Sequence, residues 1–114
     1  MTLPASAYAD SRWFDAEMDR VFAAMWIAAG RAAELDRAGA FIRRDVAGAS
    51  VLIVRGGDGA IRAFHNVCRH RGTRLCVDDQ GTLKGTIQCR YHAWTYALDG
   101  RLLSAPQMDD VDGF

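Results

Sequence analysis

Two short runs of cysteine and histidine constrain this 114-residue chain more than any other feature of its sequence. The first run is Cys68-Arg69-His70, and the second is Cys89-Arg90-Tyr91-His92, with eighteen residues between them. Each run combines one thiol with one imidazole, and both side chains are common metal ligands. A fold that uses all four groups together must bring two loops, far apart in the sequence, to the same place.

A set of two cysteines and two histidines suits a [2Fe–2S] cluster in which imidazoles replace two of the four thiolates. Both cysteines then bind one iron and both histidines the other, so each loop presents one group to each iron. Gly72 follows the first run and would let the backbone pass close to the cluster, because it has no side chain. The sequence therefore predicts one-electron transfer, with Cys68, His70, Cys89 and His92 as the ligands.

A structural zinc site is the alternative, because it is also built from two cysteines and two histidines. Zinc spacings usually begin with a pair of cysteines and end with a pair of histidines. Here each run mixes the two residue types, and the first gap is a single residue. The spacing favours the cluster over zinc.

Two stretches resemble the Rieske domain of ring-hydroxylating oxygenase α subunits: Asn66-Val67-Cys68-Arg69-His70-Arg71-Gly72 and Cys89-Arg90-Tyr91-His92-Ala93-Trp94. The similarity covers nearly the whole chain, with weaker support from residues 17–26 and 95–102. It implies a mostly β fold, in which an N-terminal helix precedes a small antiparallel Rieske-type β-sandwich with two cluster-binding loops.

The chain departs from the family pattern at two places. The family usually has glycine after the second histidine, and this chain has Ala93, a modest change unless the backbone there needs a positive φ. Rieske proteins of respiratory and photosynthetic complexes carry an extra cysteine in each loop, and the two form a disulfide. This chain has Arg71 and Tyr91 around those places, so the resemblance indicates the oxygenase or ferredoxin branches.

Family α subunits have a second, larger domain, in which two histidines and a carboxylate hold a mononuclear Fe(II). The only histidine outside the two runs is His65, which cannot supply that site alone. The resemblance thus implies an N-terminal arm and helix (residues 1–30) and a Rieske [2Fe–2S] domain (residues 31–114), with the catalytic domain absent. Residues 109–114 resemble a linker to that domain.

The resemblance also implies partners. Electrons would enter from a ferredoxin or flavin reductase and pass to the mononuclear iron. In the family the second-loop histidine, here His92, hydrogen-bonds an acidic residue of the catalytic domain, often in a neighbouring subunit, which implies a homotrimer or an α3β3 assembly. A free-standing Rieske ferredoxin is the alternative function, although small ferredoxins generally lack the N-terminal helix.

Composition and charge disfavour several other functions. The 14 basic residues, with a single lysine among them, balance the 14 acidic ones, so no basic excess predicts nucleic-acid binding. No apolar stretch reaches the roughly 18 residues of a membrane span, and no secretory signal is visible. With two cysteines assigned as ligands, Cys76 is left as a buried, unpaired thiol, which fits a reducing, cytoplasmic location.

Basic side chains gather around the two runs. They form either an ordinary solvated surface or a positive rim that steers an acidic electron donor to the cluster. These side chains are Arg69, Arg71, Arg74 and Arg90.

Hydrophobic periodicity predicts one helix from residue 10 or 11 to about residue 25, capped by Asp10 or Ser11. Its apolar residues would form one buried stripe: Phe14, Met18, Val21, Phe22 and Met25. Strand patterns follow at residues 41–46, 50–55, 60–65, 86–88, 94–98 and 101–104, with turns at 56–59, 78–81, 83–85 and 99–100. Short strands joined by turns predict a small antiparallel sandwich with both ligand loops at one tip.

Overall fold

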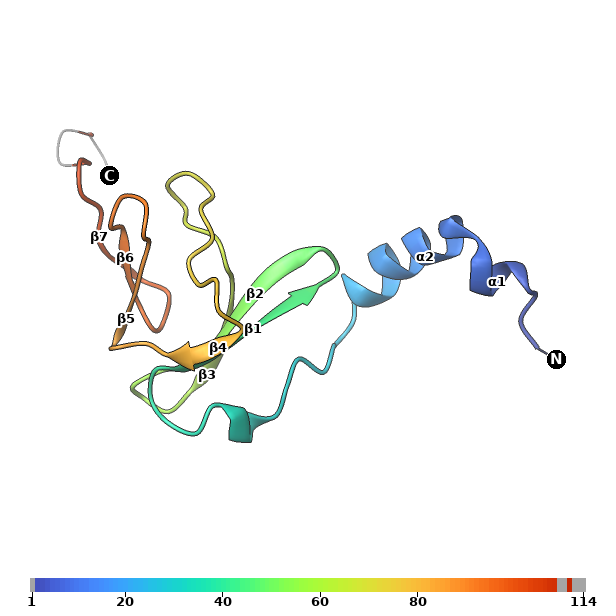
Figure 1. Cartoon of the computed structure of the whole chain (residues 1–114), viewed down its shortest axis with the longest axis horizontal. Coiled ribbons are helices and arrows are strands. Elements are labelled where there is room, and N and C mark those ends of the chain that lie inside the picture. Colours follow the sequence, from blue (N-terminus) through green and yellow to red (C-terminus); the bar gives the residue numbers. More distant parts are fainter. Residues whose placement is uncertain (1, 109–110, 112–114) are drawn as a thin grey trace.

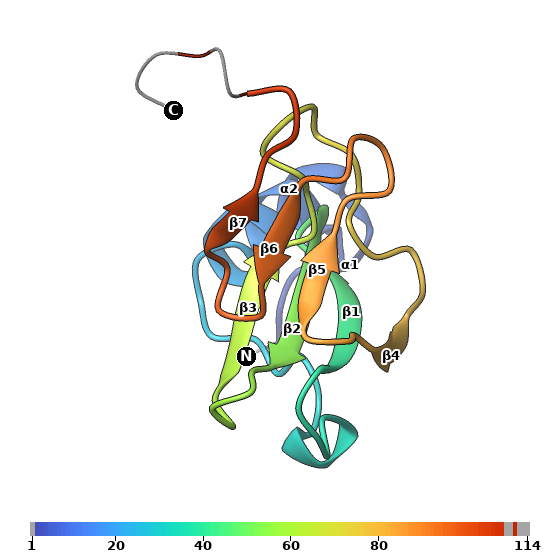
Figure 2. The same ribbon diagram turned by 90° about the vertical axis from the view of Figure 1, so that its left-hand side faces the viewer.

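The structure is a computed structural model that describes residues 2–108 and residue 111, so most of the predicted linker lies outside the described residues. Two antiparallel sheets form its body, and a helical arm precedes them (Figure 1). In Figure 2 the second sheet lies in front of the first. The mostly β fold class is therefore confirmed.

The first sheet has the strand order β3-β2-β1-β4 and the second has the order β5-β6-β7. The strands of the first sheet are β1 (Ala40–Val46), β2 (Ala49–Arg55), β3 (Ile61–His65) and β4 (Gln80–Thr82). Those of the second are β5 (Thr86–Gln88), β6 (Thr95–Ala97) and β7 (Leu102–Ser104). The first ligand loop follows the end of β3, and the second joins β5 to β6. The sheet topology therefore brings the two loops to the same end of the sandwich.

Side chains alternate along β1 and β2 and fill two separate apolar clusters. Phe41, Leu52 and Val54 face the second sheet, whose contributions include Ile87, Trp94, Tyr96 and Leu98. The other face carries Ile42 and Ile53, which pack with Leu35 and Ala40. The segment before β1, with the 3-10 turn η2 (Ala32–Glu34), covers this second face. Both faces of the first sheet are thus buried in part, which explains the strongly apolar run in β2.

Six strands were predicted from the sequence and all six are present, with bounds that differ by one residue at most at each end. The prediction missed β4, because residues 78–81 read as a turn. This strand is short, exposed and contains Gly81, so it has no apolar alternation. Its pairing with β1 creates it, through Ala40 opposite Thr82 and Phe41 opposite Gly81.

The predicted N-terminal helix is present but ends earlier than predicted, and its predicted burial is wrong. Residues 11–22 form α2 (Ser11–Glu17) and the π-helical turn η1 (Met18–Phe22), and a further short helix, α1 (Ser6–Ala9), precedes them. Asp10 caps α2 as predicted, since its side chain accepts a hydrogen bond from the Arg12 amide at 2.9 Å. The stripe that was predicted to be buried is largely exposed; Phe14 is 60% and Met25 63% accessible.

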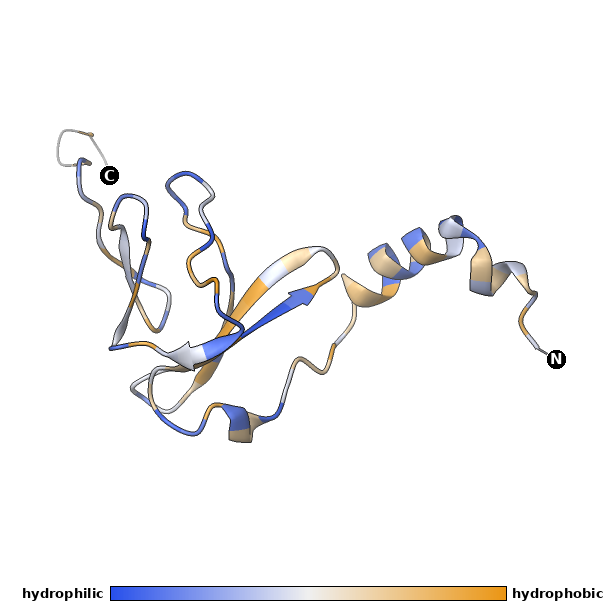
Figure 3. Ribbon diagram, viewed as in Figure 1, coloured by the Kyte–Doolittle hydropathy of each residue, from blue (hydrophilic) through white to orange (hydrophobic). Residues whose placement is uncertain are grey.

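The reason for this exposure is visible in the arrangement of the chain. The arm projects from the sheets, and its helical pieces contact mainly one another (Figure 1). Polar and apolar residues lie on different sides of the arm (Figure 3). The arm is therefore amphipathic as predicted, although no sheet packs against its apolar side. None of the helices in the described part of the chain has the length and apolar composition to cross a membrane.

Gly39 has no room for a side chain at the start of β1. Its φ is +81°, and a β-carbon added there would lie 2.1 Å from the Leu83 carbonyl oxygen. We predict that Gly39→Ala lowers the free energy of unfolding by at least about 2 kcal/mol, measured by urea denaturation. Gly57→Ala is the control, because nothing lies within 4 Å of its added carbon. Equal stability of the two variants would contradict this account.

Candidate metal centre

The two ligand loops lie side by side at one end of the sandwich (Figures 1 and 2). Cys68 and Cys89 are both buried in the core between the sheets, at 1% and 2% exposure. His70 and His92 lie half-buried nearer the surface, with ring centroids 4.6 Å apart. The structure therefore brings all four predicted residues together and sorts them by type, with thiols inside and imidazoles outside.

Both loops are built on the same backbone pattern. The Cys68 amide donates to the Thr73 carbonyl at 2.8 Å, and the Gly72 amide donates back to the Cys68 carbonyl at 3.0 Å. In the second loop the Cys89 amide donates to the Trp94 carbonyl at 2.8 Å, and the Ala93 amide to the Cys89 carbonyl at 3.0 Å. Each loop thus closes on its cysteine, four and five residues later.

The fourth position after each cysteine has a left-handed backbone. Gly72 has φ +70° and Ala93 has φ +57°. Glycine adopts this conformation without cost, whereas a β-carbon makes it unfavourable by about 1–2 kcal/mol. The departure from the family pattern at Ala93 is therefore at a position that needs a positive φ.

The surroundings of Cys68 favour its thiolate. Burial raises the pKa of Cys68, but hydrogen bonds from the Tyr96 hydroxyl, the His70 backbone amide and the Cys89 thiol outweigh it, and the net pKa is lowered. Burial also lowers the pKa of His70, helped by the nearby His92 and Arg71. A thiolate and a neutral imidazole are the protonation states in which these residues bind metals.

Aromatic rings enclose the two imidazoles. The Trp94 ring stacks on His70 with centroids 4.9 Å apart, and the Tyr91 ring tilts against His92 at 3.8 Å. Trp94 is 5% exposed and Tyr91 60%, so one ring closes the inner side of the site and the other partly covers its outer side. These rings restrict water around the imidazoles and hold their orientation.

The donor set fits a [2Fe–2S] cluster better than zinc. Nδ1 of His92 is buried and has no hydrogen-bond partner among the described residues, as expected for an atom reserved for a metal. Zinc needs about four ligands around one ion. Within the described part of the chain, no three Cys, His, Asp or Glu side chains converge closely enough to hold a single ion. In a [2Fe–2S] cluster each iron needs only two protein ligands, so the four side chains need not surround one ion.

The two other candidates from the sequence lie outside the donor set. Cys76 is a buried free thiol in the core, and burial raises its pKa. His65 is an exposed residue at the end of β3. The position of Cys76 agrees with the sequence interpretation of this residue as a buried, unpaired thiol.

Asn66 is a positioning residue that sequence reasoning did not single out. It is 3% exposed and lies directly before the first loop. Its side-chain amide donates to the Cys76 carbonyl at 2.6 Å and accepts from the Cys76 amide at 2.9 Å. This pair of bonds joins the two ends of the first ligand loop, with a further bond to the Ser50 hydroxyl at 3.2 Å.

Tyr96 is the second residue that the sequence interpretation missed. It lies on β6, is 7% exposed, and its hydroxyl is 3.3 Å from the Cys68 sulfur. The Arg69 amide donates to the same oxygen at 3.1 Å, so the hydroxyl proton is free to point at the sulfur. Burial and the bond to Cys68 raise the pKa of Tyr96 to about 12, which keeps that proton in place. A buried tyrosine on a strand generally needs such a partner, and this was the available signal.

The four arginines beside the loops are exposed and form no ion pair with another described residue. The ion pairs between described residues involve other arginines, such as Arg43 with Asp45 and Arg62 with Asp58. None of these pairs involves the loop arginines, which are Arg69, Arg71, Arg74 and Arg90. The end of the sandwich that carries the ligand loops thus presents four arginines with no ion-pair partner among the described residues.

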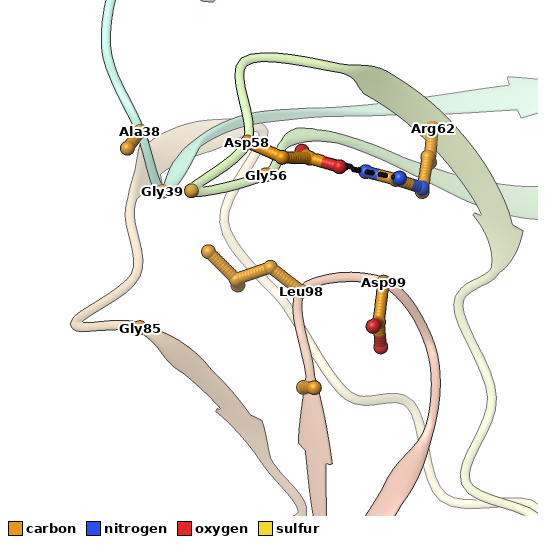
Figure 4. Close-up of a pocket in the computed structure, with 10 residues that line it drawn as sticks. Ala38, Gly39, Gly56, Asp58, Arg62, Gly85, Leu98 and Asp99 are labelled. Atoms are coloured by element: carbon orange, nitrogen blue, oxygen red, sulfur yellow. Dashed lines mark hydrogen bonds and ion pairs between the residues drawn. The ribbon is translucent and has the colours of Figure 1, made fainter.

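A pocket at the opposite ends of the strands offers no comparable chemistry. It has a volume of about 340 Å³ and is lined largely by turn residues, among them Gly39, Gly56 and Gly85. Figure 4 shows Asp58 engaged with Arg62 at its wall, with Asp99 nearby. Its one arginine is thus already paired, and no thiol or imidazole lines it.

Comparisons with known proteins agree with this site. Residues 25–114 match the family described as Rieske [2Fe-2S] domain. The chain is 45% identical over 104 residues to the glycine betaine monooxygenase oxygenase subunit of Pseudomonas aeruginosa, covering 91% of the chain and 24% of that protein. It is 42% identical over 113 residues to the carnitine monooxygenase oxygenase subunit of Escherichia coli K12, covering 99% of the chain and 30% of that protein.

A solved structure gives the same result in three dimensions. The quaternary ammonium Rieske monooxygenase CntA in complex with L-carnitine superposes with a TM-score of 0.92 at 42% identity. The match covers 99% of this chain and 32% of that one. The chain thus spans 24% to 32% of the length of these relatives.

The left-handed backbone at the same position of both loops predicts that removing a methyl group at Ala93 and adding one at Gly72 change the free energy of unfolding in opposite directions. Ala93→Gly should raise the free energy of unfolding by about 1 kcal/mol, because it removes the strain of a left-handed alanine. Gly72→Ala should lower it by a similar amount, since nothing lies within 4 Å of the added carbon and only the backbone term remains. Urea denaturation of the metal-free chain measures both. A destabilised Ala93→Gly variant would show that the methyl group makes contacts that outweigh the strain.

The Tyr96 hydroxyl should raise the reduction potential of a cluster bound at Cys68. Its hydrogen bond stabilises negative charge on the sulfur, which is greater in the reduced state. We predict that Tyr96→Phe lowers the potential by about 50 mV, since such a bond is worth about 1 kcal/mol. A redox titration followed by visible absorption measures the shift. Tyr91→Phe is the control, because Tyr91 contacts His92 through its ring; an equal shift in both variants would refute the assignment.

Proposed function

Since the chain belongs to the Rieske [2Fe–2S] domain family, we propose that it is the electron-entry domain of a Rieske oxygenase subunit. The observation that carries the proposal is the sorted ligand set, with two buried thiols beneath two half-buried imidazoles on twin loops. When bound, the [2Fe–2S] cluster is a one-electron carrier. Two imidazole ligands raise its reduction potential.

Each residue of the site has a distinct role in this proposal. Cys68 and Cys89 would bind one iron of the cluster, and His70 and His92 would bind the other. The Tyr96 hydroxyl and the backbone amide of His70 stabilise the Cys68 sulfur. The half-buried imidazoles form the exit towards solvent or a partner, because the thiols are closed off by the core. Their second nitrogens can bind a carboxylate or release a proton.

An electron-entry domain needs an electron acceptor and an electron donor. The mononuclear Fe(II) that uses the electrons belongs to the catalytic domain, in the part of the relatives' length that this chain does not span. His92 is the residue proposed to hydrogen-bond an acidic group of that domain in the same or a neighbouring subunit, in a homotrimer or α3β3 assembly. A ferredoxin or flavin reductase is the proposed donor, and the loop arginines are proposed to attract its acidic surface.

The relatives refine the expected reaction. The two relatives named above act, by their names, as monooxygenases of glycine betaine and carnitine, and CntA is a quaternary ammonium monooxygenase. We therefore infer a monooxygenase of a quaternary ammonium compound in preference to an aromatic ring-hydroxylating dioxygenase. The residues that would select the substrate lie outside this chain.

The alternative of a free-standing ferredoxin has less support. The relatives are oxygenase subunits, and the match to carnitine monooxygenase includes the N-terminal arm, since it covers 99% of this chain. The division into an arm (residues 1–30) and a Rieske domain (residues 31–114) stays a proposal. The three cysteines form no disulfide, which fits the proposed cytoplasmic location.

An EPR spectrum of the dithionite-reduced protein tests the function. We expect a Rieske-type signal that is lost in Cys89→Ala and His92→Ala. The matched controls Cys76→Ala and His65→Gln should keep it, because neither residue belongs to the donor set. Circular dichroism would show that all four variants are folded. Retention of the signal in Cys89→Ala, or an EPR-silent protein with one bound zinc, would overturn the proposal.

The loop arginines should affect the rate at which electrons enter the cluster, and not the binding of the cluster. We predict that Arg69→Gln combined with Arg90→Gln slows reduction by an acidic ferredoxin about tenfold at low salt, and that high salt removes the difference. Stopped-flow absorption measures the rate. The control combines Arg12→Gln with Arg37→Gln, which removes two exposed arginines that lie elsewhere and are paired with Asp10 and Asp36. Equal slowing by both double variants would argue against a docking surface.

A further inference from the structure

A cavity between the two sheets has no part in the candidate metal centre. Its volume is about 420 Å³, and none of the four proposed cluster ligands lines it. Three residues of β3 line it, together with residues of β2, β5 and β6. Because β3 is the edge strand of the first sheet, the cavity lies at a side of the sandwich that no further strand closes.

Buried side chains form the floor of this cavity. The floor residues are Leu52, Leu75, Ile87 and Tyr96, each at most 9% exposed. Phe64 and Gly100 also line the cavity, and a β-carbon added to Gly100 would lie 2.7 Å from the Phe64 ring. That ring therefore packs directly on the Gly100 backbone. Aliphatic and aromatic surfaces of this kind favour an apolar group as the occupant.

The rim of the cavity carries basic side chains. His65 and Arg69 line it, and both residues are exposed. Arg69 forms no ion pair with a described residue, and none of the described residues that line the cavity is acidic. A guanidinium group binds a carboxylate through two parallel hydrogen bonds. The rim therefore complements an anion, whereas the floor complements an apolar body.

We propose that this cavity binds a small hydrophobic monocarboxylate, with its carboxylate at Arg69 and its apolar body on the buried floor. Small-molecule sites have volumes of roughly 300–1,000 Å³ and a mainly apolar lining, with a few polar groups that fix the orientation of the ligand. The Tyr96 hydroxyl is 3.3 Å from the Cys68 sulfur, so the occupant would contact a residue that supports the metal centre. The binding site itself does not depend on the proposed function.

Isothermal titration calorimetry of the 114-residue chain tests the site with butanoate, hexanoate and octanoate. We expect binding to tighten up to about fourfold with each added methylene group, because each group is buried on the apolar floor. The neutral alcohol 1-octanol should bind about fivefold more weakly than octanoate, because it cannot form the ion pair. Straight-chain and aromatic acids share this chemistry. Tighter binding of 3-phenylpropanoate than of octanoate would assign the site to aromatic acids, and weaker binding to straight-chain acids.

Variants locate the bound carboxylate. Arg69→Gln should weaken octanoate binding about fivefold and leave 1-octanol binding unchanged, whereas Arg69→Lys should retain most of the affinity for octanoate. Arg74→Gln is the matched control, because Arg74 is also a loop arginine without an ion-pair partner among the described residues and does not line the cavity. Trp26→Ser tests the exposed apolar side of the arm as a competing site. Circular dichroism would show that each variant is folded.

Three results would overturn this proposal. The first is no heat of binding with octanoate at millimolar concentration, or an affinity that does not change with chain length. The second is equal weakening by Arg69→Gln and Arg74→Gln, because general attraction to the loop arginines would then explain binding. The third is loss of binding in Trp26→Ser, because the arm would then hold the acid.

Discussion

The hydrogen bonds that close the two ligand loops on their own cysteines support everything else at this site. In each loop the cysteine amide reaches the carbonyl five residues later, and the amide four residues later returns to the cysteine carbonyl. This turn directs the thiol inwards and leaves the following histidine nearer the surface. Because both loops repeat the pattern, the two thiols meet in the core and the two imidazoles meet above them.

The sandwich supplies the environment that those turns need. Cys68 and Cys89 belong to the same apolar cluster as Leu52, Val54 and Ile87, which the two sheets enclose. Asn66 holds the ends of the first loop together, and Tyr96 reaches across from the second sheet to the Cys68 sulfur. The site therefore depends on both sheets, because residues of each sheet surround the cysteines of the two ligand loops.

The arm shows where local pattern and tertiary packing diverge. The periodicity of residues 10–25 was interpreted correctly as an amphipathic helix, and its predicted cap at Asp10 is present. Its burial was not, because the helical pieces contact mainly one another and no sheet lies beneath them. The missed strand β4 is the converse case, in which pairing with β1 imposes extended structure on residues that have no strand pattern.

The sequence by itself indicated the family, the strands on either side of the two Cys/His runs and the four proposed donors, because Cys/His spacing and two-residue alternation are local properties. Only the tertiary structure decided which donors lie inside, that Ala93 adopts a left-handed backbone, and that Tyr96 and Asn66 contact the loops. Each of these depends on contacts between residues ten or more positions apart, or on a turn geometry that residue type does not specify. Such contacts exist only after the sheets have packed, so local pattern alone does not specify which residues they join.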